Sequence, residues 1–260
     1  MSSTTPSTSS KKRLAVQSAV LALGLSMSAF TYSALDQQGG LMNQSKSHLK
    51  SLTPQQQAII IISTFAAAGD MSGLNAALNQ GLGAGVKISD AREVLIQLYA
   101  YAGFPRSLNA ITELMKVLEA RNQRGIHDEP GLEPSQPIPK GDDLLVAGTA
   151  NQTTLAGSVV QGPLFDFAPV ANEYLRTHLF GDIFERDNLD WKTRELATIG
   201  MLSALSGVEP QLQAHMRMSM NTGLTERHLL ELCQLLGERA GIERADRAKQ
   251  ALQRHLASIR

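Results

Sequence analysis

One stretch of the sequence combines a charged pair and a single histidine at a spacing that could carry proton-transfer chemistry. Arg194 and Glu195 open the run RELATIGMLSALSGVEPQLQAH, which is mostly small and apolar and ends in His215. An imidazole can give and take a proton near neutral pH, and a carboxylate that orients one ring nitrogen leaves the other free to do so. A guanidinium can hold a carboxylate through two hydrogen bonds. These residue types therefore indicate acid/base chemistry on a small carboxylated molecule.

The predicted helices would bring these residues together. We expect a helix from Pro210, and it places His215 on an apolar face. The other members of that face, at helical spacing, are Leu212, Met216 and Ser219. Glu195 lies in the first turn of the preceding predicted helix. A hairpin across Gly207 would set the start of that helix beside the C-terminal half of the helix that carries His215.

The same residues also have structural interpretations, which the sequence leaves open. A single histidine on an apolar face is commonly a core residue, Glu195 could serve only the positive end of a helix dipole, and Arg194 could be a surface charge. Tyr101 either packs in an apolar run or reaches the rim of a site with its hydroxyl. Glu93 and Glu231 occur at matching places in the two halves of the chain, on solvated flanks or at a site. We predict catalytic roles for His215 and Glu195, and substrate contacts for Arg194, Tyr101 and Glu231.

Composition excludes several function classes. The 260-residue chain has 24 Lys plus Arg and 24 Asp plus Glu, so it lacks the basic character of a nucleic-acid-binding protein. Its six histidines form no HExxH or HxH pair, and we predict neither a metal site nor a cofactor. Cys233 is the single cysteine, which excludes an intrachain disulfide and a CxxC redox pair. Because it lies among leucines, we expect an inert, buried thiol.

The N-terminal segment is typical of a targeting signal. Lys11, Lys12 and Arg13 precede the apolar run LAVQSAVLALGL, and the first acidic residue is Asp36. A basic patch, a short apolar run and small residues after it indicate a secretory signal over 1–34. We therefore expect a periplasmic or secreted protein, with an organellar or cytoplasmic location as the alternative. The apolar run is too short to cross a bilayer comfortably, so no stable membrane insertion is expected.

After Leu52 the sequence reads as a succession of helices. The expected caps are Thr53 with Gln56 in a capping box, Ser89, Asp190 and Thr225. The expected helices cover about 54–69, 72–83, 89–103, 105–124, 165–180, 190–206 and 210–222, and two more follow, one capped by Thr225 and a last one from about Glu243. The segment 125–163 is rich in Pro, Gly, Asp and Asn and has no sustained period, so we predict a linker there.

An internal duplication is indicated by residues that recur at a fixed offset. Leu74, Gly85 and Glu93 each have the same residue 138 positions later, at Leu212, Gly223 and Glu231. The period is too long for a solenoid. We therefore predict an all-α protein of two tandem helical repeats, 35–124 and 164–260, packed as a pseudo-dimer.

Two stretches carry a resemblance to a known family. The run RELATIGMLSALSGVEPQLQAHMRMSMNTGLT resembles the core of the carboxymuconolactone decarboxylase family, and LYAYAGFPRSLNA resembles the segment that closes the same domain. The resemblance covers about 52–124 and 185–255 and is that of a tandem, two-repeat member. It implies an all-α bundle that forms ring-like homo-oligomers, here a trimer of two-repeat chains, and a small acid or lactone as ligand.

The family has two chemistries, and this sequence resembles one of them more closely. One branch decarboxylates a carboxylated muconolactone; the alkylhydroperoxidase D-like branch uses a Glu…CxxC…His relay with peroxiredoxin-type activity. Glu195 and His215 occupy positions like the ends of that relay, but the stretch between them where the cysteines would lie reads SGVEPQ. A dithiol relay needs two thiols. The resemblance thus implies the lyase branch, with Arg194 holding a carboxylate, His215 protonating the dienolate and Glu195 setting the tautomer.

Three alternatives accompany this hypothesis. The first is a peroxidase-like activity, which the missing cysteine pair disfavours. The second is a non-catalytic oligomeric module that binds a small molecule. In the third, one composite site lies between the repeats, with Tyr101 from one and His215 from the other.

Overall fold

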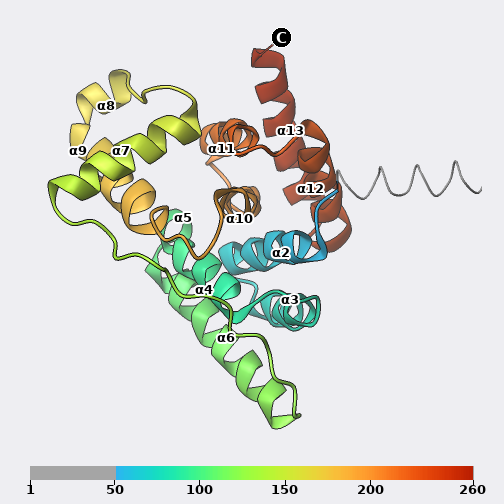
Figure 1. Cartoon of the computed structure of the whole chain (residues 1–260). Helices are drawn as coiled ribbons and strands as arrows, with labels where there is room; N and C mark the ends of the chain where they lie inside the picture. Colours follow the sequence, from blue (N-terminus) through green and yellow to red (C-terminus); the bar gives the residue numbers. More distant parts are fainter. Residues whose placement is uncertain (1–50, 260) are drawn as a thin grey trace, which may run out of the picture. The chain divides into compact units, whose positions relative to one another are not determined.

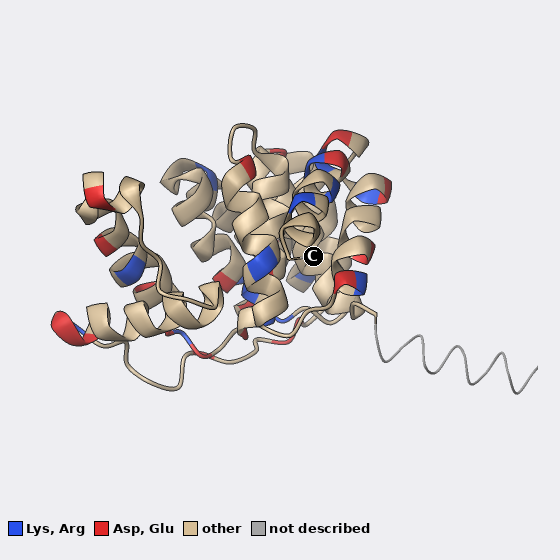
Figure 2. Cartoon of the chain, turned by 90° about the horizontal axis from the view of Figure 1, so that it is seen from above, with Lys and Arg blue, Asp and Glu red and all other residues tan. Residues whose placement is uncertain are grey.

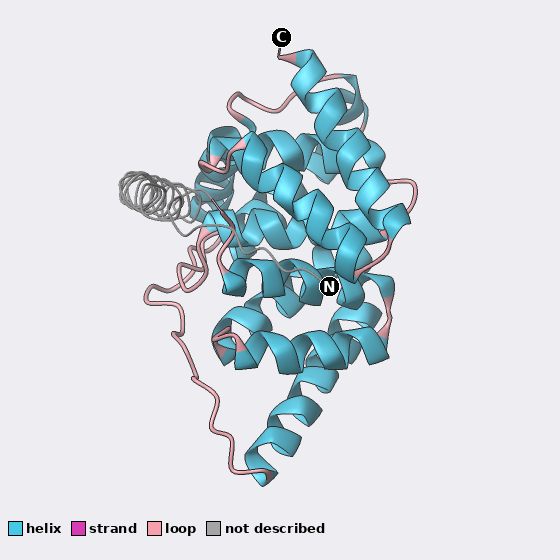
Figure 3. Ribbon diagram, turned by 90° about the vertical axis from the view of Figure 1, so that its right-hand side faces the viewer, coloured by secondary structure: helices cyan, strands magenta, loops and turns pink. Residues whose placement is uncertain are grey.

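Every regular element in the described part of the chain, residues 51–259 of this computed structural model, is a helix (Figure 3). The helices are α2 (Pro54–Ala68), α3 (Met71–Gly83), α4 (Ile88–Gln97), α5 (Tyr99–Ala102), α6 (Phe104–Gln123), α7 (Asp142–Ala156), α8 (Pro163–Phe167), α9 (Pro169–Tyr174), the π-helix η1 (Leu175–Ile183), α10 (Trp191–Ala204), α11 (Glu209–Asn221), α12 (Glu226–Arg239) and α13 (Ile242–Ser258). The predicted all-α class is confirmed. The predicted signal over 1–34 lies outside the described residues.

Helices α2 and α10 form the centre of the fold. Helices α3, α4 and α6 contact α2, and α11 and α13 contact α10, so that the two groups lie on either side of the central pair (Figure 1). Both central helices are buried nearly all round, as expected for apolar helices without a polar face. At Gly200 a Cβ atom would lie 2.7 Å from the Ile60 carbonyl oxygen, and the Thr64 hydroxyl donates to the Gly200 carbonyl at 3.2 Å. The glycine therefore permits the close approach of the two backbones.

Three of the four predicted caps are confirmed. The Thr53 hydroxyl accepts a hydrogen bond from the Gln56 amide at 3.2 Å, and the Gln56 side chain accepts one from the Thr53 amide at 3.0 Å. The Asp190 carboxylate caps α10, and Thr225 caps α12 in a capping box with His228. Of these caps, that of Asp190 fixes where α10, the helix that carries Glu195, begins.

The prediction that Ser89 caps a helix is wrong, because Ser89 lies inside α4 and not before it. The residue that precedes α4 is Lys87, which makes no side-chain cap. The Ser89 hydroxyl instead accepts a hydrogen bond from the Leu132 amide at 3.2 Å, and the Ser89 amide donates to the Pro130 carbonyl at 2.9 Å. The serine thus holds the chain that follows α6 against α4. The predicted helix over 89–103 is also divided at Leu98 into α4 and α5.

The predicted linker over 125–163 contains a helix that the sequence analysis did not expect, since α7 occupies 142–156. Its sequence, DDLLVAGTANQTTLA, lacks a strong apolar stripe because small residues make its contacts. A Cβ atom at Gly148 would lie 1.8 Å from the Arg176 carbonyl oxygen, so α7 rests directly on the backbone of η1. Asp142 and Asp143 in its first turn complement the helix dipole.

The expected helix over 165–180 consists of α8, α9 and the start of η1, which pack with α7 apart from the central helices (Figure 1). Their buried side chains form a second apolar cluster that is separate from the main core: Leu155, Ala156, Leu179, Phe180, Ile183, Phe184 and Met218. Met218 belongs to α11, so this cluster also attaches the α7–η1 unit to the helix that carries His215. A π-helix is rare and is found frequently at functional sites.

The order of the helices agrees with the predicted duplication. In their order along the chain, the helices α2, α3, α4 and α6 correspond to α10, α11, α12 and α13. The matched glycines Gly85 and Gly223 both have a positive φ, of 89° and 96°. These features favour two repeats. The division into repeats and their pseudo-dimeric packing stay predictions.

Acidic and basic residues of the described chain are interspersed over its helices (Figure 2). Within residues 51–259, no helix has both the length and the apolar character that crossing a membrane requires.

Candidate functional site

The predicted pair of His215 and Glu195 is brought together by the α10–α11 hairpin. Gly207, in the connection, has φ of 80°, and the chain reverses there. The Nδ1 atom of His215 lies 2.8 Å from Oε2 of Glu195, and both residues are buried. An ionised carboxylate can only accept, so Nδ1 carries the hydrogen and Nε2 is the nitrogen left for other chemistry. The arrangement is the one expected of an oriented general acid/base.

His215 lies at the wall of a cavity of about 740 Å3, between α11 and α5 on one side and α7, α8, α9 and η1 on the other. Its side chain lines this cavity, and Nε2 has no hydrogen-bond partner among the described residues. The core interpretation of His215 is therefore only half right. The residue is buried at 6% exposure, yet one ring nitrogen remains available to a ligand.

The Glu195 carboxylate is fully buried, and its second oxygen, Oε1, has no hydrogen-bond partner in the described chain. A buried carboxylate with an unpaired oxygen is costly unless a charge compensates it. The imidazole is the group that hydrogen-bonds to this carboxylate. The pair is thus more than a helix-dipole interaction, because the glutamate makes a direct hydrogen bond to the ring and fixes its orientation.

Tyr101 lies in the cavity next to His215, as predicted for a substrate contact. Its ring meets the imidazole edge-on, with centroids 5.6 Å apart and planes at 76°. The Thr198 hydroxyl lies 3.3 Å from the Tyr101 hydroxyl. Burial, together with the negative charge of Glu195, raises the pKa of Tyr101 far above its usual range, so the side chain stays a neutral phenol. Because Tyr101 comes from the first half and His215 from the second, the cavity agrees with the composite-site alternative.

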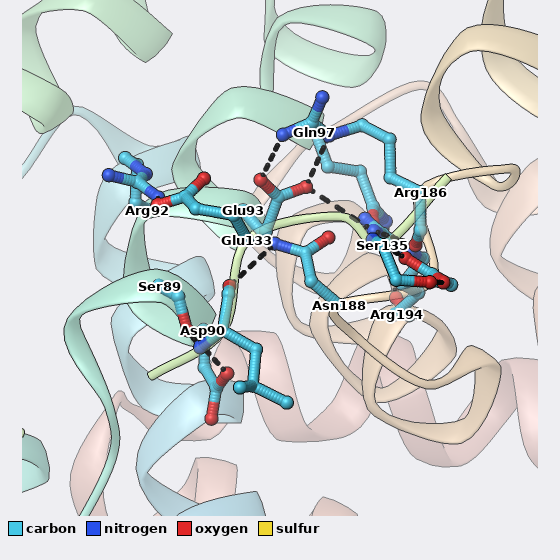
Figure 4. Close-up of polar contacts among 12 residues, drawn as sticks. Ser89, Asp90, Arg92, Glu93, Gln97, Glu133, Ser135, Arg186, Asn188 and Arg194 are labelled. Atoms are coloured by element: carbon cyan, nitrogen blue, oxygen red, sulfur yellow. Dashed lines mark hydrogen bonds and ion pairs between the residues drawn. The ribbon is translucent and has the colours of Figure 1, made fainter. Parts of the chain in front are cut away.

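Arg194 does not fit the predicted role of substrate anchor. Its guanidinium is fully buried outside the cavity, with Nη2 3.3 Å from Oε2 of Glu93 and 2.8 Å from the Arg186 carbonyl oxygen (Figure 4). Its Nη1 lies 3.3 Å from Oε1 of Gln97. The side chain points from α10 toward α4, whereas Glu195, the next residue, points toward α11. One helical step of about 100° separates the two directions.

Glu93, expected on a solvated flank or at a site, is instead the centre of a buried ionic network. Arg186 binds it in two-pronged fashion, with nitrogen–oxygen distances of 2.8 and 2.6 Å (Figure 4). Burial by itself would raise the pKa of the Glu93 carboxyl, but the Arg186 hydrogen bonds and the charge of Arg194 hold it below its usual value. The network joins α4, α10 and the segment before α10.

Glu231 does not fit the predicted substrate contact either. Its carboxylate accepts hydrogen bonds from the Leu52 amide at 3.1 Å and from the Gln57 side chain at 3.2 Å. It therefore joins α12 to the start of α2, and it does not line the cavity. The match with Glu93 in the predicted repeats reflects two different packing contacts.

Sequence reasoning missed two basic residues of the cavity, Arg217 and His178. Arg217 is exposed and follows His215 by two residues in HMRMSM. His178, on η1, has its Nδ1 2.8 Å from Oδ2 of Asp182, and its ring meets that of Tyr99 edge-on. The i, i+4 spacing of His178 and Asp182 was a readable signal. It was missed although a helix was expected there, because that helix was taken to end at 180 and Asp182 lies beyond it.

Cys233 is buried, as expected. Burial raises the pKa of its thiol to about 12, so almost no thiolate forms near neutral pH.

The comparison with known families places most of this site within one domain. Residues 169–254 match the model of the Carboxymuconolactone decarboxylase family. This part of the chain belongs to the carboxymuconolactone decarboxylase family. The carboxymuconolactone decarboxylase segment contains Glu195, His215, Arg217 and His178, whereas Tyr101 and α7 lie before it. No curated protein matches the chain.

Proposed function

We propose that this chain is a cofactor-independent enzyme that acts on a small carboxylated lactone or a related acid, with His215 as the general acid/base. At the family level its function is of the carboxymuconolactone decarboxylase or alkylhydroperoxidase D-like kind. The observation that carries the proposal is the buried Glu195–His215 pair, 2.8 Å apart, with the free ring nitrogen at a cavity.

The reaction that suits this geometry is a decarboxylation. The bond between the substrate carbon and its carboxylate breaks, carbon dioxide leaves, and the electron pair enters a conjugated carbonyl to give a dienolate. Protonated His215 donates the hydrogen on Nε2 to the dienolate carbon and then regains a proton from water. Glu195 keeps the other hydrogen on Nδ1, so that the ring always presents the same nitrogen.

A cation must hold the acid in place, and Arg217 takes the role first predicted for Arg194. It lines the same cavity as His215 from the same helix, and within residues 51–259 it forms no ion pair. Its fork of donors suits a carboxylate. Tyr101 offers a neutral hydroxyl to the carbonyl oxygen that gains charge.

The peroxidase-like alternative has little to support it. A dithiol relay needs two accessible thiols, whereas this chain has one buried cysteine. The alternative that the experiment must separate is the non-catalytic binding module.

The test measures thermal unfolding and carbon dioxide release with a panel of carboxylated lactones and aromatic acids. A ligand at a hundred times its dissociation constant stabilises the fold by about 2.7 kcal/mol, enough for a shift of a few degrees. We expect one class of acid to raise the unfolding temperature of the wild type and to be decarboxylated by it. His215→Ala should abolish the release of carbon dioxide and remain folded. Arg254→Gln, an exposed arginine on α13 that is not part of the cavity, is the matched control. Binding without turnover in the wild type would favour the binding module.

We also propose that the chain is exported and forms a homo-oligomer, a trimer of two-repeat chains. The N-terminal sequence pattern supports export. Exposed apolar side chains on α6 support assembly: Phe104, Leu108 and Met115 are 60%, 58% and 65% exposed.

A further inference from the structure

The lining of the cavity contains more apolar surface than a small oxygenated acid could cover. Its wall opposite His215 comes from α8, α9 and η1 and includes Leu164, Phe165, Tyr174 and Leu175. Tyr99 closes one side, stacked on Phe104 with ring centroids 4.5 Å apart. These side chains bring aromatic and aliphatic surface to the space in front of the catalytic pair.

The size of the cavity agrees with its apolar lining. Sites of about 300–1,000 Å3 hold drug-sized ligands, and this one has about 740 Å3. A small polar lactone beside His215 would leave most of the apolar wall in contact with water. A ligand that covers Phe165 and Leu164 as well therefore has a larger apolar body than a small lactone.

The charges around the cavity favour an anion at one end only. Arg217 lies at the wall, and no Asp or Glu is among the described residues that line the cavity. The carboxylate next to His215, that of Glu195, is buried behind the imidazole. A ligand with one carboxylate and an apolar remainder satisfies both the arginine and the wall.

We infer that the substrate of this site is a monocarboxylic acid with a bulky apolar body, of fused-ring size. Its carboxylate pairs with Arg217, its reactive carbon lies at Nε2 of His215, and its body lies against α8, α9 and η1. The inference rests on the proposed function for the role of His215 and names the substrate class of that site.

Titration calorimetry on the full chain tests the inference with benzoate, 2-naphthoate, 2-naphthamide and the small polar diacid maleate. Each methylene-sized group buried contributes about 0.8 kcal/mol, or about fourfold in affinity. We expect 2-naphthoate to bind at least about tenfold more tightly than benzoate, and maleate to bind most weakly. Arg217→Gln should weaken the binding of 2-naphthoate about tenfold and leave the affinity for the neutral 2-naphthamide unchanged.

Two phenylalanines on α8 provide a matched pair of variants. Phe165 lines the cavity, whereas Phe167 is 90% exposed and does not. We expect Phe165→Ala to weaken the binding of 2-naphthoate about tenfold. Phe167→Ala should change the affinity by less than about twofold. Equal affinities for benzoate and 2-naphthoate, or equal losses in the two variants, would overturn the inference. So would tightest binding of maleate or of the amide.

The two proposals fail separately. If the apolar acids bind as expected but none of the acid panel is turned over through His215, the catalytic proposal is wrong and the binding inference stands. If a small polar lactone is turned over through His215 while 2-naphthoate does not bind, the inference is wrong and the catalytic proposal stands.

Discussion

At the scale of single residues, the direction in which each side chain leaves α10 decides its role. Arg194 and Glu195 are neighbours, yet the first enters the ionic network with Glu93 and the second meets His215. Both are fully buried. A substitution at either position thus removes a buried charge, but only one of the two should affect the chemistry directly.

Glu195→Gln should lower kcat by about 10²-fold or more, because an amide can accept or donate at Nδ1 and so no longer fixes which ring nitrogen carries the hydrogen. The side chain keeps its shape, so we expect the near-ultraviolet circular dichroism to stay that of the wild type. Steady-state kinetics on a turned-over acid check this, with Arg254→Gln as control. Unchanged kcat would remove Glu195 from the mechanism.

Glu93→Ala should cost about 3–5 kcal/mol of unfolding free energy, because it leaves the buried Arg194 guanidinium without its acidic partner. Urea unfolding measures the loss. Asp246→Ala, at an exposed position on α13, should stay within about 0.5 kcal/mol of the wild type. Equal effects of the two substitutions would show that the network adds nothing to stability.

The same carboxylate makes stability depend on pH. Because the pKa of Glu93 is lower in the folded chain than its ordinary value of 4.5, the unfolded state binds more protons between the two values. Its contribution is fully present above pH 4.5 and is lost as the pH falls through the folded pKa. Urea unfolding from pH 7 to pH 3 should show this decline, and Glu93→Gln should flatten it. An equally steep decline in the variant would assign the pH dependence to other carboxylates.

At the scale of elements, η1 lines the cavity opposite α11 and α5, and its contact with α7 depends on one glycine. Gly148→Ala would place a Cβ atom against the Arg176 carbonyl of η1. We expect a loss of stability of about 1–3 kcal/mol and weaker ligand binding. Gly83→Ala, on α3 with no neighbour within 4 Å, is the matched control and should be neutral or slightly stabilising. Thermal unfolding and calorimetry distinguish the two variants; identical behaviour would contradict the direct helix contact.

The elements that the sequence predicted well are those with strong local signals. The Thr53 capping box and the Asp190 cap fixed the starts of α2 and α10, and the apolar face of α11 together with Gly207 correctly indicated the meeting of His215 and Glu195. Helix α7 was missed because Ala, Gly and Thr make its contacts, and small residues leave no apolar period. The role of Arg194 was predicted wrongly. Spacing shows which residues share a face of a helix, but it does not show which element packs against that face.

At the scale of the whole molecule, one cavity joins parts of the chain that lie far apart in the sequence. Tyr101 comes from the first half, the wall from the segment predicted partly as linker, and His215 from the family domain. The segment 169–254 alone therefore lacks Tyr101 and α7, which complete the cavity. The function should belong to the chain from α2 to α13, and the matched segment expressed by itself should not bind the acid.

The last prediction concerns assembly. Phe104, Leu108 and Met115 present apolar surface on α6, and Tyr99, which lines the cavity, is stacked on Phe104. An interface on this face would thus also hold one side of the cavity. Leu108→Glu should dissociate the trimer, because a carboxylate buried in an apolar interface is costly, and sedimentation velocity measures the change. Ile242→Glu, an equally apolar and 67% exposed position on α13, is the control. A wild type that sediments as a monomer would contradict the proposed trimer, and a trimer that persists in Leu108→Glu would place its interface elsewhere.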